Sequence, residues 1–439
     1  MFSSISDPAS RLDAEFEGRS PWPSPSASGT VIPLTRSQVA ALIKRARREG
    51  ISRRDLMKIF AVGGLGAVFA ACERPPPPSS SSASELGVAD VPWVKNPEPF
   101  IQHPTNLETR LELLDGVITP NELFFVRNHA PTPRIDVSEY RLHVSGAAID
   151  QAVELTMDDL RDDLPSQSVV AYLECGGNWR GFWGSIVGRA AAGGQWGTGG
   201  ISCAEWRGPT LASVLALAGV RSSAVDVDLI GLDEGGFSRP MPIARALDPT
   251  TLLAHTMNGV DLPPDHGFPL RGVVPGWVGS SSVKWLGRIV VSSEKIWSRN
   301  NLTSYVLVGE DWPADEYAPA DGGPINAGVV KSALALPRPA ELPAGSNSIA
   351  GFAYSPSGPV QRVEWSADDG TTWQAARILD PVLPHAWQRF QFEWDAPAGS
   401  HTLLTRATDA AGQSQPDQIA YNSKGYLLNI VLPHPVTVS

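Results

Sequence analysis

Apolar residues alternate between helical and extended spacing in the part of the chain from about residue 95 to 325. The apolar positions of 211–218 fall on one face of a helix, which Gly219 ends. Another short helix, over 156–164, begins with the spacing of a capping box. The β-branched run 169–173 has the composition of a buried strand. This mixture of short helices and strands predicts an α+β domain.

Beyond residue 325 the helical spacing stops and short β-rich runs follow one another. These runs are 349–354, 363–367, 373–378, 388–394 and 401–408. Asp368-Asp369-Gly370, between two of them, has the composition of a hairpin turn. Strands at this spacing are typical of an immunoglobulin-like sandwich. The predicted fold class is therefore α+β, with a mixed α/β domain over 95–325 followed by an all-β immunoglobulin-like domain over 326–439.

The first 72 residues have the features of an export leader. Residues 52–58 read S-R-R-D-L-M-K and precede an apolar, Gly/Ala-rich run over 59–71 that is about half the length needed to cross a bilayer. This combination predicts a twin-arginine signal and a periplasmic protein. The run ends at Cys72 in a sequence similar to a lipobox, so lipidation of Cys72 and an unmodified leader both remain open.

Residues 73–94 have the composition of a tether. Four prolines, 75–78, precede six residues rich in serine, 79–84, and such a segment has nothing to bury. It predicts a stiff and then flexible spacer between the leader and the globular domains.

The balance of charge bears on the partners of the protein. The formal net charge is −11, from 35 Lys and Arg against 46 Asp and Glu. Many of the basic residues lie within 36–58, so the globular part is more acidic than the total indicates. An acidic body argues against nucleic acid as a partner and fits a basic electron carrier.

The chain has three cysteines, Cys72, Cys175 and Cys203, in no C-x-x-C or zinc-like spacing. We therefore expect no iron–sulfur cluster and no c-type haem in this chain. A disulfide between Cys175 and Cys203 is one interpretation for an exported protein. The alternative is that Cys203, in a strand-like context, is a small core residue while Cys175 has a different role.

Cys175 stands at the end of the predicted strand and is followed by Gly-Gly-Asn-Trp-Arg. Glycines allow a tight turn there, and the positive charge of Arg180 favours the thiolate. Thiolates are the ligands that soft metals prefer. A buried, inert cysteine is the alternative interpretation of this segment taken alone.

Two further clusters combine hydrogen-bond donors with sharp turns. Arg127, Asn128 and His129 follow an aromatic pair and precede prolines, a set suited to phosphate or oxyanion. The second cluster, over 265–284, combines glycines and serines with His266, Arg271 and Lys284. Glycines allow close approach of the backbone to a phosphate, and the basic side chains supply the counter-charge. Each cluster alone also fits a solvated loop.

The motifs that carry these residues are F-F-V-R-N-H-x-P-x-P at 124–133, C-x-G-N-x-R at 175–180, W-G-x-G-G-I-S-x-A-x-W-x-G at 196–208, M-N-G-x-x-L-P-x-D-H-G-F-P-L-R at 257–271 and V-K-W-L at 283–286. In order and spacing they resemble the sulfite oxidase family of molybdopterin oxidoreductases, over about residues 95–430. The resemblance implies the sulfite oxidase fold and a molybdenum ion held by the two sulfurs of one molybdopterin and by Cys175.

The resemblance also implies roles for other residues. Those that would bind the cofactor are Arg127, Asn128, His129, Cys175, Asp233, His266, Arg271, Ser282, Val283 and Lys284. Those that would act at the substrate are Cys175, Arg127, Arg180, Tyr305, Trp196 as a wall of the pocket, and Lys424. Three departures from animal and plant relatives affect the predicted substrate site. Trp179 replaces a second arginine, Lys424 replaces an arginine, and Tyr305 comes later in the chain than in those relatives. They favour a bacterial branch, and they leave open whether its natural substrate is free sulfite or another sulfur compound.

The resemblance implies two-electron oxidation of sulfite to sulfate with electrons passed to a separate cytochrome c. The alternative is the sulfane-sulfur dehydrogenase component of a thiosulfate-oxidising system. A periplasmic methionine-sulfoxide reductase fits less well because those relatives lack the C-terminal sandwich. From another class, the chain could be a lipid-tethered binding module with an inactive cofactor domain. The all-β domain is expected to form a homodimer through Trp365, Trp373, Trp387 and Trp394, although these residues equally fit a sandwich core.

Overall fold

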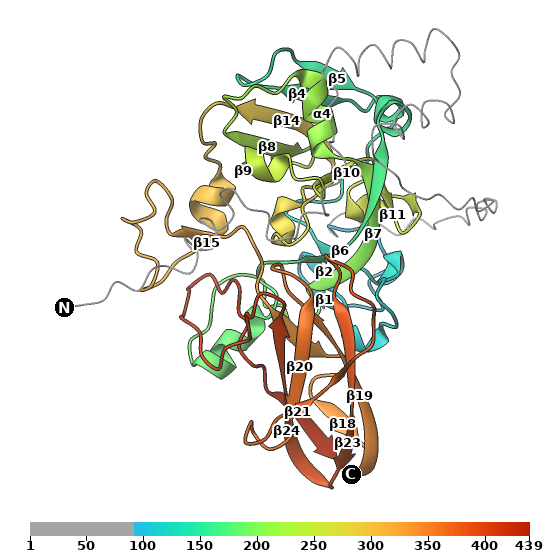
Figure 1. Ribbon diagram of the computed structural model, residues 1–439, viewed down its shortest axis with the longest axis vertical. Helices are drawn as coiled ribbons and strands as arrows, with labels where there is room; N and C mark the ends of the chain where they lie inside the picture. The colour runs from blue at the N-terminus through green and yellow to red at the C-terminus, as the bar shows by residue number, and fades with distance from the viewer. Residues whose placement is uncertain (1–91) are drawn as a thin grey trace, which may run out of the picture. The chain divides into compact units, whose positions relative to one another are not determined.

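The computed structural model describes residues 92–439, which Figure 1 draws in colour. The twin-arginine motif, Cys72 and nearly all of the predicted tether lie outside the described residues. Within the described part, no helix combines the length and the apolar character that crossing a bilayer requires.

A five-stranded sheet forms the core of the first domain. Its strands, in spatial order, are β5 (Val153–Leu155), β4 (Leu142–Ser145), β14 (Leu286–Ser292), β8 (Asp226–Gly231) and β9 (Ser238–Pro242). β14 pairs parallel with β4 and antiparallel with β8. Helix α4 (Leu211–Ala218) covers this sheet with its four predicted apolar residues, all buried in the same core. Thr210 caps its start, and Gly219, at φ +68°, ends it as predicted.

A second sheet carries the predicted cysteine turn. Its strands, in spatial order, are β12 (Val260–Asp261), β11 (Thr256–Met257), β7 (Ile201–Pro209) and β6 (Ser166–Glu174). β6 and β7 pair antiparallel over their whole length, with Tyr172 opposite Cys203. The predicted strand 169–173 is thus confirmed as part of β6, which ends immediately before Cys175.

The first domain contains more sheet and less helix than the sequence pattern indicated. Among the described residues the α-helices are α4 and α5 (Ile243–Ala246), and the other helical segments are single 3-10 or π turns. The predicted helix over 156–164 is such a turn, η3 (Asp159–Asp163). Its capping box is present: the backbone N–H of Thr156 donates to Asp159 Oδ2 at 2.9 Å, and that of Asp159 donates to Thr156 Oγ1 at 3.2 Å.

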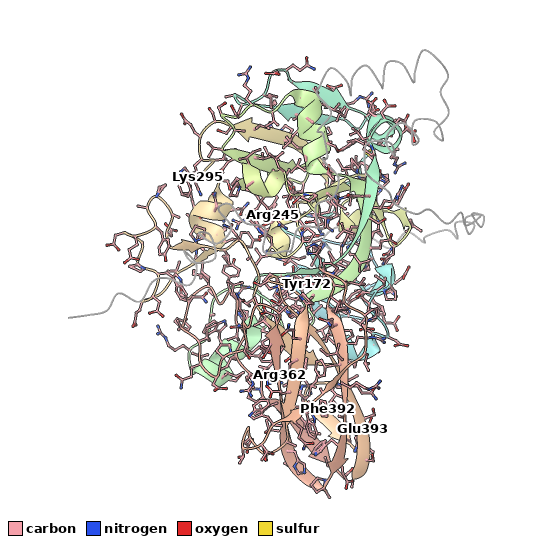
Figure 2. All side chains as sticks on the ribbon, in the orientation of Figure 1. Tyr172, Arg245, Lys295, Arg362, Phe392 and Glu393 are labelled. Carbon is pink, nitrogen blue, oxygen red and sulfur yellow. The ribbon has the colours of Figure 1, made fainter. Side chains whose placement is uncertain are left out.

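The C-terminal domain is all-β and consists of two sheets. One has the order β17 (Lys331–Leu334), β19 (Gly345–Tyr354), β23 (Gln388–Ala396) and β22 (Arg377–Ile378). The other has the order β18 (Ala340–Leu342), β25 (His434–Val438), β24 (Gly399–Asp409), β20 (Val360–Ser366) and β21 (Gln374–Ala375). Both sheets contribute to one core that contains Trp365, Trp394 and Phe392, the last labelled in Figure 2.

The predicted strands of this domain are present, with one difference. The run 373–378 is split, because β21 pairs with β20 in one sheet while β22 pairs with β23 in the other. The hairpin turn before β21 has positive φ at Asp369 (+53°) and Gly370 (+81°), which suits its Asp-Asp-Gly sequence.

The two domains share a hydrophobic core where they meet. Tyr172, which Figure 2 labels at this junction, packs in one cluster with Cys203 of the first domain and with Phe352, Tyr354 and Trp387 of the second. The backbone N–H of Tyr172 donates to the carbonyl of residue 385 at 3.0 Å. Figure 1 shows β6 and β7 running down to this junction from the first domain.

Cys203 is fully buried in this shared core, as predicted for a small core residue. Cys175 and Cys203 are both free thiols, so the disulfide interpretation is wrong. Cys203 faces Tyr172, three residues before Cys175, so the two Cα atoms lie on the order of 10 Å apart, beyond the reach of a disulfide.

Candidate active site

One cavity in the first domain gathers residues from segments that are far apart in the sequence. Of the predicted site residues, it is lined by Arg127, Asn128, His129, Cys175, Asp233, His266, Arg271, Ser282, Val283, Lys284 and Tyr305. The remaining lining residues are Phe124, Phe125, Leu173, Gly176, Phe237, Asp265, Gly279, Ser280 and Trp285. The cavity therefore combines an apolar wall, one thiol and several basic side chains.

Cys175 is held at the cavity by a tightly bonded turn. Its backbone N–H donates to the carbonyl of Gly200, and its carbonyl accepts from the backbone N–H of Asn178, each at 2.8 Å. Asn178 Oδ1 in turn accepts from the backbone N–H of Gly200 at 2.9 Å. The backbone of Gly279 lies so close that a Cβ there would come within 2.8 Å of the carbonyl oxygen of Glu174. Gly279 is thus required by close backbone packing beside the turn.

The opposite end of the cavity buries positive charge, and we call Arg271, Lys284 and the His266 beside them the basic end. Arg271 donates to the backbone carbonyls of His266 at 2.9 Å and Ser282 at 3.0 Å. Lys284 donates to the carbonyl of Asp265 at 2.9 Å and to the Asn128 side chain. Burial lowers the pKa of Arg271 to about 9 and the pKa of Lys284 well below its usual value. Within residues 92–439 neither cation forms an ion pair with a carboxylate. A buried cation in this state is unfavourable until an anion binds, so this end fits a phosphate group.

The carboxylate nearest the basic end is already engaged by the chain itself. Asp265 accepts hydrogen bonds from the backbone N–H groups of Val94 and Lys95, the latter at 2.8 Å, and from the hydroxyl of Thr132 at 2.5 Å. Asp233 Oδ1 accepts from the backbone N–H of Phe237 at 3.1 Å. These two are the acids among the lining residues, and both support backbone turns.

Lys95 was missed by the sequence analysis and lies directly behind His266. Its ammonium is 2.6 Å from the carbonyl oxygen of Asn121, 2.8 Å from that of Phe124 and 2.7 Å from His266 Nε2. Burial lowers the pKa of Lys95 to about 7, and burial and the neighbouring lysines hold the pKa of His266 well below its usual range. His266 is therefore neutral, with one ring nitrogen occupied by Lys95. Nothing in the local sequence around Lys95 indicates this role.

Two neutral hydrogen-bonding groups face the cavity beside the cysteine. His129 Nε2 lies 2.9 Å from the hydroxyl of Tyr305, and its ring stacks on Phe237 with centroids 4.5 Å apart. Burial, reinforced by Arg127 and Lys284, lowers the pKa of His129 to about 3, and burial raises the pKa of Tyr305. The phenol thus stays protonated and can donate to the neutral imidazole or to a bound molecule.

Three predicted substrate residues do not line this cavity. Arg180 is tied to backbone carbonyls, with Nε 2.7 Å from that of Lys424 and Nη1 3.1 Å from that of Gly194. The side chain of Lys424 donates to the carbonyl of Thr303. Trp196 is buried and packs edge-on against Phe125 with ring centroids 6.0 Å apart.

The lining residues fit a molybdopterin cofactor. Cys175 offers one soft sulfur ligand, Arg271 and Lys284 offer a phosphate site, and Asn128 and the neutral His129 offer polar contacts between them. Within residues 92–439 no group of three or more His, Cys, Asp or Glu is placed to hold a metal ion.

Comparison with known proteins agrees with this chemistry. Residues 129–300 match the oxidoreductase molybdopterin binding domain, and residues 324–438 match the Mo-co oxidoreductase dimerisation domain. The chain is 39% identical over 350 residues to the mitochondrial sulfite oxidase of Homo sapiens, and the matched region covers 75% of this chain and 63% of the human protein. It is 38% identical over 348 residues to the sulfite oxidase of Gallus gallus, covering 74% of each.

A solved structure is also similar. The sulfane dehydrogenase SoxCD from Paracoccus pantotrophus superimposes with a TM-score of 0.68 at 28% identity, covering 77% of this chain and 88% of that chain. The chain spans 63% of the length of the mammalian sulfite oxidases that it matches. With two family domains matched and more than a third of its residues identical to sulfite oxidases over most of its length, the chain belongs to the sulfite oxidase family of molybdopterin oxidoreductases.

Proposed function

We propose that the chain binds one molybdenum–molybdopterin and catalyses the two-electron oxidation of a sulfur compound. The observation that carries this proposal is the cavity itself, which is lined by a free thiol and by buried cations that form no ion pair within residues 92–439. Arg271 and Lys284 would hold the phosphate, and Cys175 would bind the metal. When bound, the cofactor supplies a metal centre that accepts two electrons and transfers oxygen.

The residues of the chain have three tasks in this reaction. Arg127, on the cavity wall, attracts and orients an anionic substrate through its guanidinium group. The Tyr305 hydroxyl, held beside neutral His129, donates a hydrogen bond to the substrate oxygen without releasing a proton. The apolar side chains Phe124, Phe125 and Leu173 keep water from most of the cavity, which strengthens both interactions.

The substrate we propose is sulfite, oxidised to sulfate as sulfite and water yield sulfate, two protons and two electrons. A separate cytochrome c would accept the electrons one at a time. The excess of acidic over basic residues in the chain supports a basic partner. The match to a dimerisation domain supports a homodimer. The twin-arginine sequence at 52–58 supports export to the periplasm, with lipidation of Cys72 as an additional anchor.

A sulfane-sulfur dehydrogenase is the second candidate. Arg180 and Lys424 are engaged with backbone carbonyls instead of lining the cavity, so fewer cations face a substrate there than the family motif implies. A larger substrate of lower charge density, such as a carrier-bound persulfide, suits this arrangement. The similarity to the structure of a sulfane dehydrogenase also supports this second candidate.

Steady-state assays with cytochrome c as acceptor decide between the two candidates. The purified, molybdenum-loaded protein is given sulfite, thiosulfate or a protein-bound persulfide in parallel. Turnover with sulfite supports the first candidate, and turnover with the persulfide alone supports the second. Folded protein that contains no molybdenum after expression in a cofactor-producing host would overturn both and favour a binding module.

A further inference from the structure

A buried ion pair links the residue before Cys175 to the C-terminal domain. Glu174 Oε1 lies 2.7 Å from Lys331 Nζ, 2.9 Å from the hydroxyl of Tyr354 and 3.0 Å from Asn178 Nδ2. Glu174 is 3% and Lys331 1% exposed, so both charges are removed from water. Lys331 belongs to β17 and Tyr354 to β19, whereas the carboxylate ends β6 of the cofactor domain.

The same hydrogen-bond network holds both sides of the cysteine turn. Asn178 joins Glu174 through its Nδ2 and the Gly200 N–H through its Oδ1, and its own N–H donates to the carbonyl of Cys175. Lys331 Nζ also reaches the carbonyl of Asn178 at 3.4 Å. The position of the Cys175 backbone thus depends on one carboxylate and on the lysine that neutralises it.

Lys331 neutralises a buried negative charge next to the proposed metal ligand, in addition to packing in the core. A lone buried carboxylate one residue before a metal-bound thiolate would add negative charge beside the metal, and the Lys331 ammonium, 5.1 Å from the centre of the Trp179 ring, cancels that charge. A buried pair is costly to break from one side, because the remaining charge loses both water and its partner. Replacing both charges by neutral groups of similar shape costs far less.

We propose that Glu174 and Lys331 are positioning residues through which the C-terminal domain fixes the geometry and the charge environment of the Cys175 ligand. The C-terminal domain then has a task inside the active site besides dimerisation. The inference rests on the proposed role of Cys175 as a metal ligand.

The test compares Glu174→Gln, Lys331→Met and the double variant with Arg389→Met. Arg389 is a matched control because it also joins the domains, through Asp115 at 3.1 Å and Asp380 at 2.9 Å, and the cavity is not lined by it. The midpoint potential of the metal centre is measured for each loaded protein, together with molybdenum content and thermal unfolding.

We expect shifts of opposite sign. Glu174→Gln leaves an unpaired positive charge near the thiolate and raises the potential, whereas Lys331→Met leaves a negative charge and lowers it. The double variant should unfold near the wild-type temperature with a potential between those of the single variants. Each single variant should lose roughly 10- to 100-fold in metal affinity, as for residues that orient metal ligands. Arg389→Met should lower the unfolding temperature without moving the potential.

A purely structural role gives a different pattern. Potentials that do not move, or that move in one direction for both single variants, would overturn the inference even if stability falls. Hydrogen exchange of the backbone N–H groups of 175–180 in cofactor-free protein gives a second readout. We expect faster exchange there in both single variants and not in Arg389→Met, and unchanged exchange counts against the inference. Absence of molybdenum from the wild-type protein would overturn the proposed function. The exchange measurement would still test whether Glu174 and Lys331 hold the backbone of the Cys175 turn.

Discussion

At the basic end of the cavity, Arg271 and Lys284 are buried with carbonyl and amide oxygens as partners, whereas at the cysteine end Glu174 is buried against Lys331. The first arrangement leaves an excess of positive charge that a bound anion can neutralise. The second is neutral before any ligand arrives. The difference indicates that the basic end becomes more stable when the cofactor binds, whereas the cysteine end holds the geometry of the metal ligand whether or not the cofactor is bound.

The largest effect is expected when the cysteine end loses its sulfur. Cys175→Ser removes the thiol that lines the cavity within residues 92–439, so we expect loss of bound molybdenum and a fall in kcat/KM of more than about 100-fold, beyond the cost of losing a residue that only orients a metal ligand. Metal analysis and steady-state assays measure both. Cys203→Ala, in the shared core, is the control and should retain its molybdenum. A serine variant with wild-type metal content would contradict the assignment.

Matched lysine substitutions at the two ends sharpen the comparison. Lys284→Met removes a buried cation from the basic end, so the cofactor-free protein should gain about 1 kcal/mol in free energy of unfolding, while cofactor affinity falls roughly 10- to 100-fold. Lys331→Met should instead destabilise the cofactor-free protein, because it leaves Glu174 unpaired. Chemical denaturation and cofactor retention on dilution measure these changes. If both variants lose stability equally, the buried lysines at the two ends of the cavity contribute to stability in the same way, which would contradict the comparison.

Arg127→Gln tests whether the substrate is anionic. Loss of a charge-assisted hydrogen bond of about 1.5 kcal/mol should raise the KM for sulfite roughly tenfold. Arg288→Gln, at an exposed position of β14, is the control and should leave the KM unchanged. An unchanged KM in the Arg127 variant would show that this guanidinium does not bind the substrate.

The smallest effect on catalysis is expected at Lys95, where the change appears in the pH dependence of stability. The pKa of Lys95 in the folded chain, about 7, lies below its ordinary value of 10.5, so between these pH values the unfolded chain binds more protons. The free energy of unfolding should therefore rise with pH across this window, by about 3 kcal/mol relative to a Lys95→Met variant. Denaturation of cofactor-free protein at pH 7 and pH 10 measures it. Parallel pH profiles for the two proteins would contradict the lowered pKa.

Local sequence was sufficient for most of the lining of the cavity. Arg127 to His129, His266, Arg271 and Lys284 stand in short motifs in which a strand end or a tight turn places donors within a few residues of one another. The α4 face and the hairpin at Asp369 and Gly370 were likewise predictable, because helical periodicity and positive φ depend on neighbours in the chain.

Other residues could not be placed in this way. Arg180 has the sequence context of a substrate ligand, yet its guanidinium is satisfied by the carbonyls of Gly194 and Lys424. Lys95 reaches His266 across 171 residues. Such long side chains point toward the buried hydrogen-bond acceptors that tertiary packing brings within their reach. The local sequence pattern does not show where these acceptors lie.

The sequence alone determined the family motifs, the strand that delivers Cys175, the helix face of α4 and the change to an all-β domain near residue 325. Tertiary structure alone decided that β6 and β17 meet, that Glu174 is neutralised by Lys331 from the other domain, and that Cys175 and Cys203 remain free. Periodicity and turn chemistry are local, but the burial of a charge becomes favourable only when a distant segment supplies its partner.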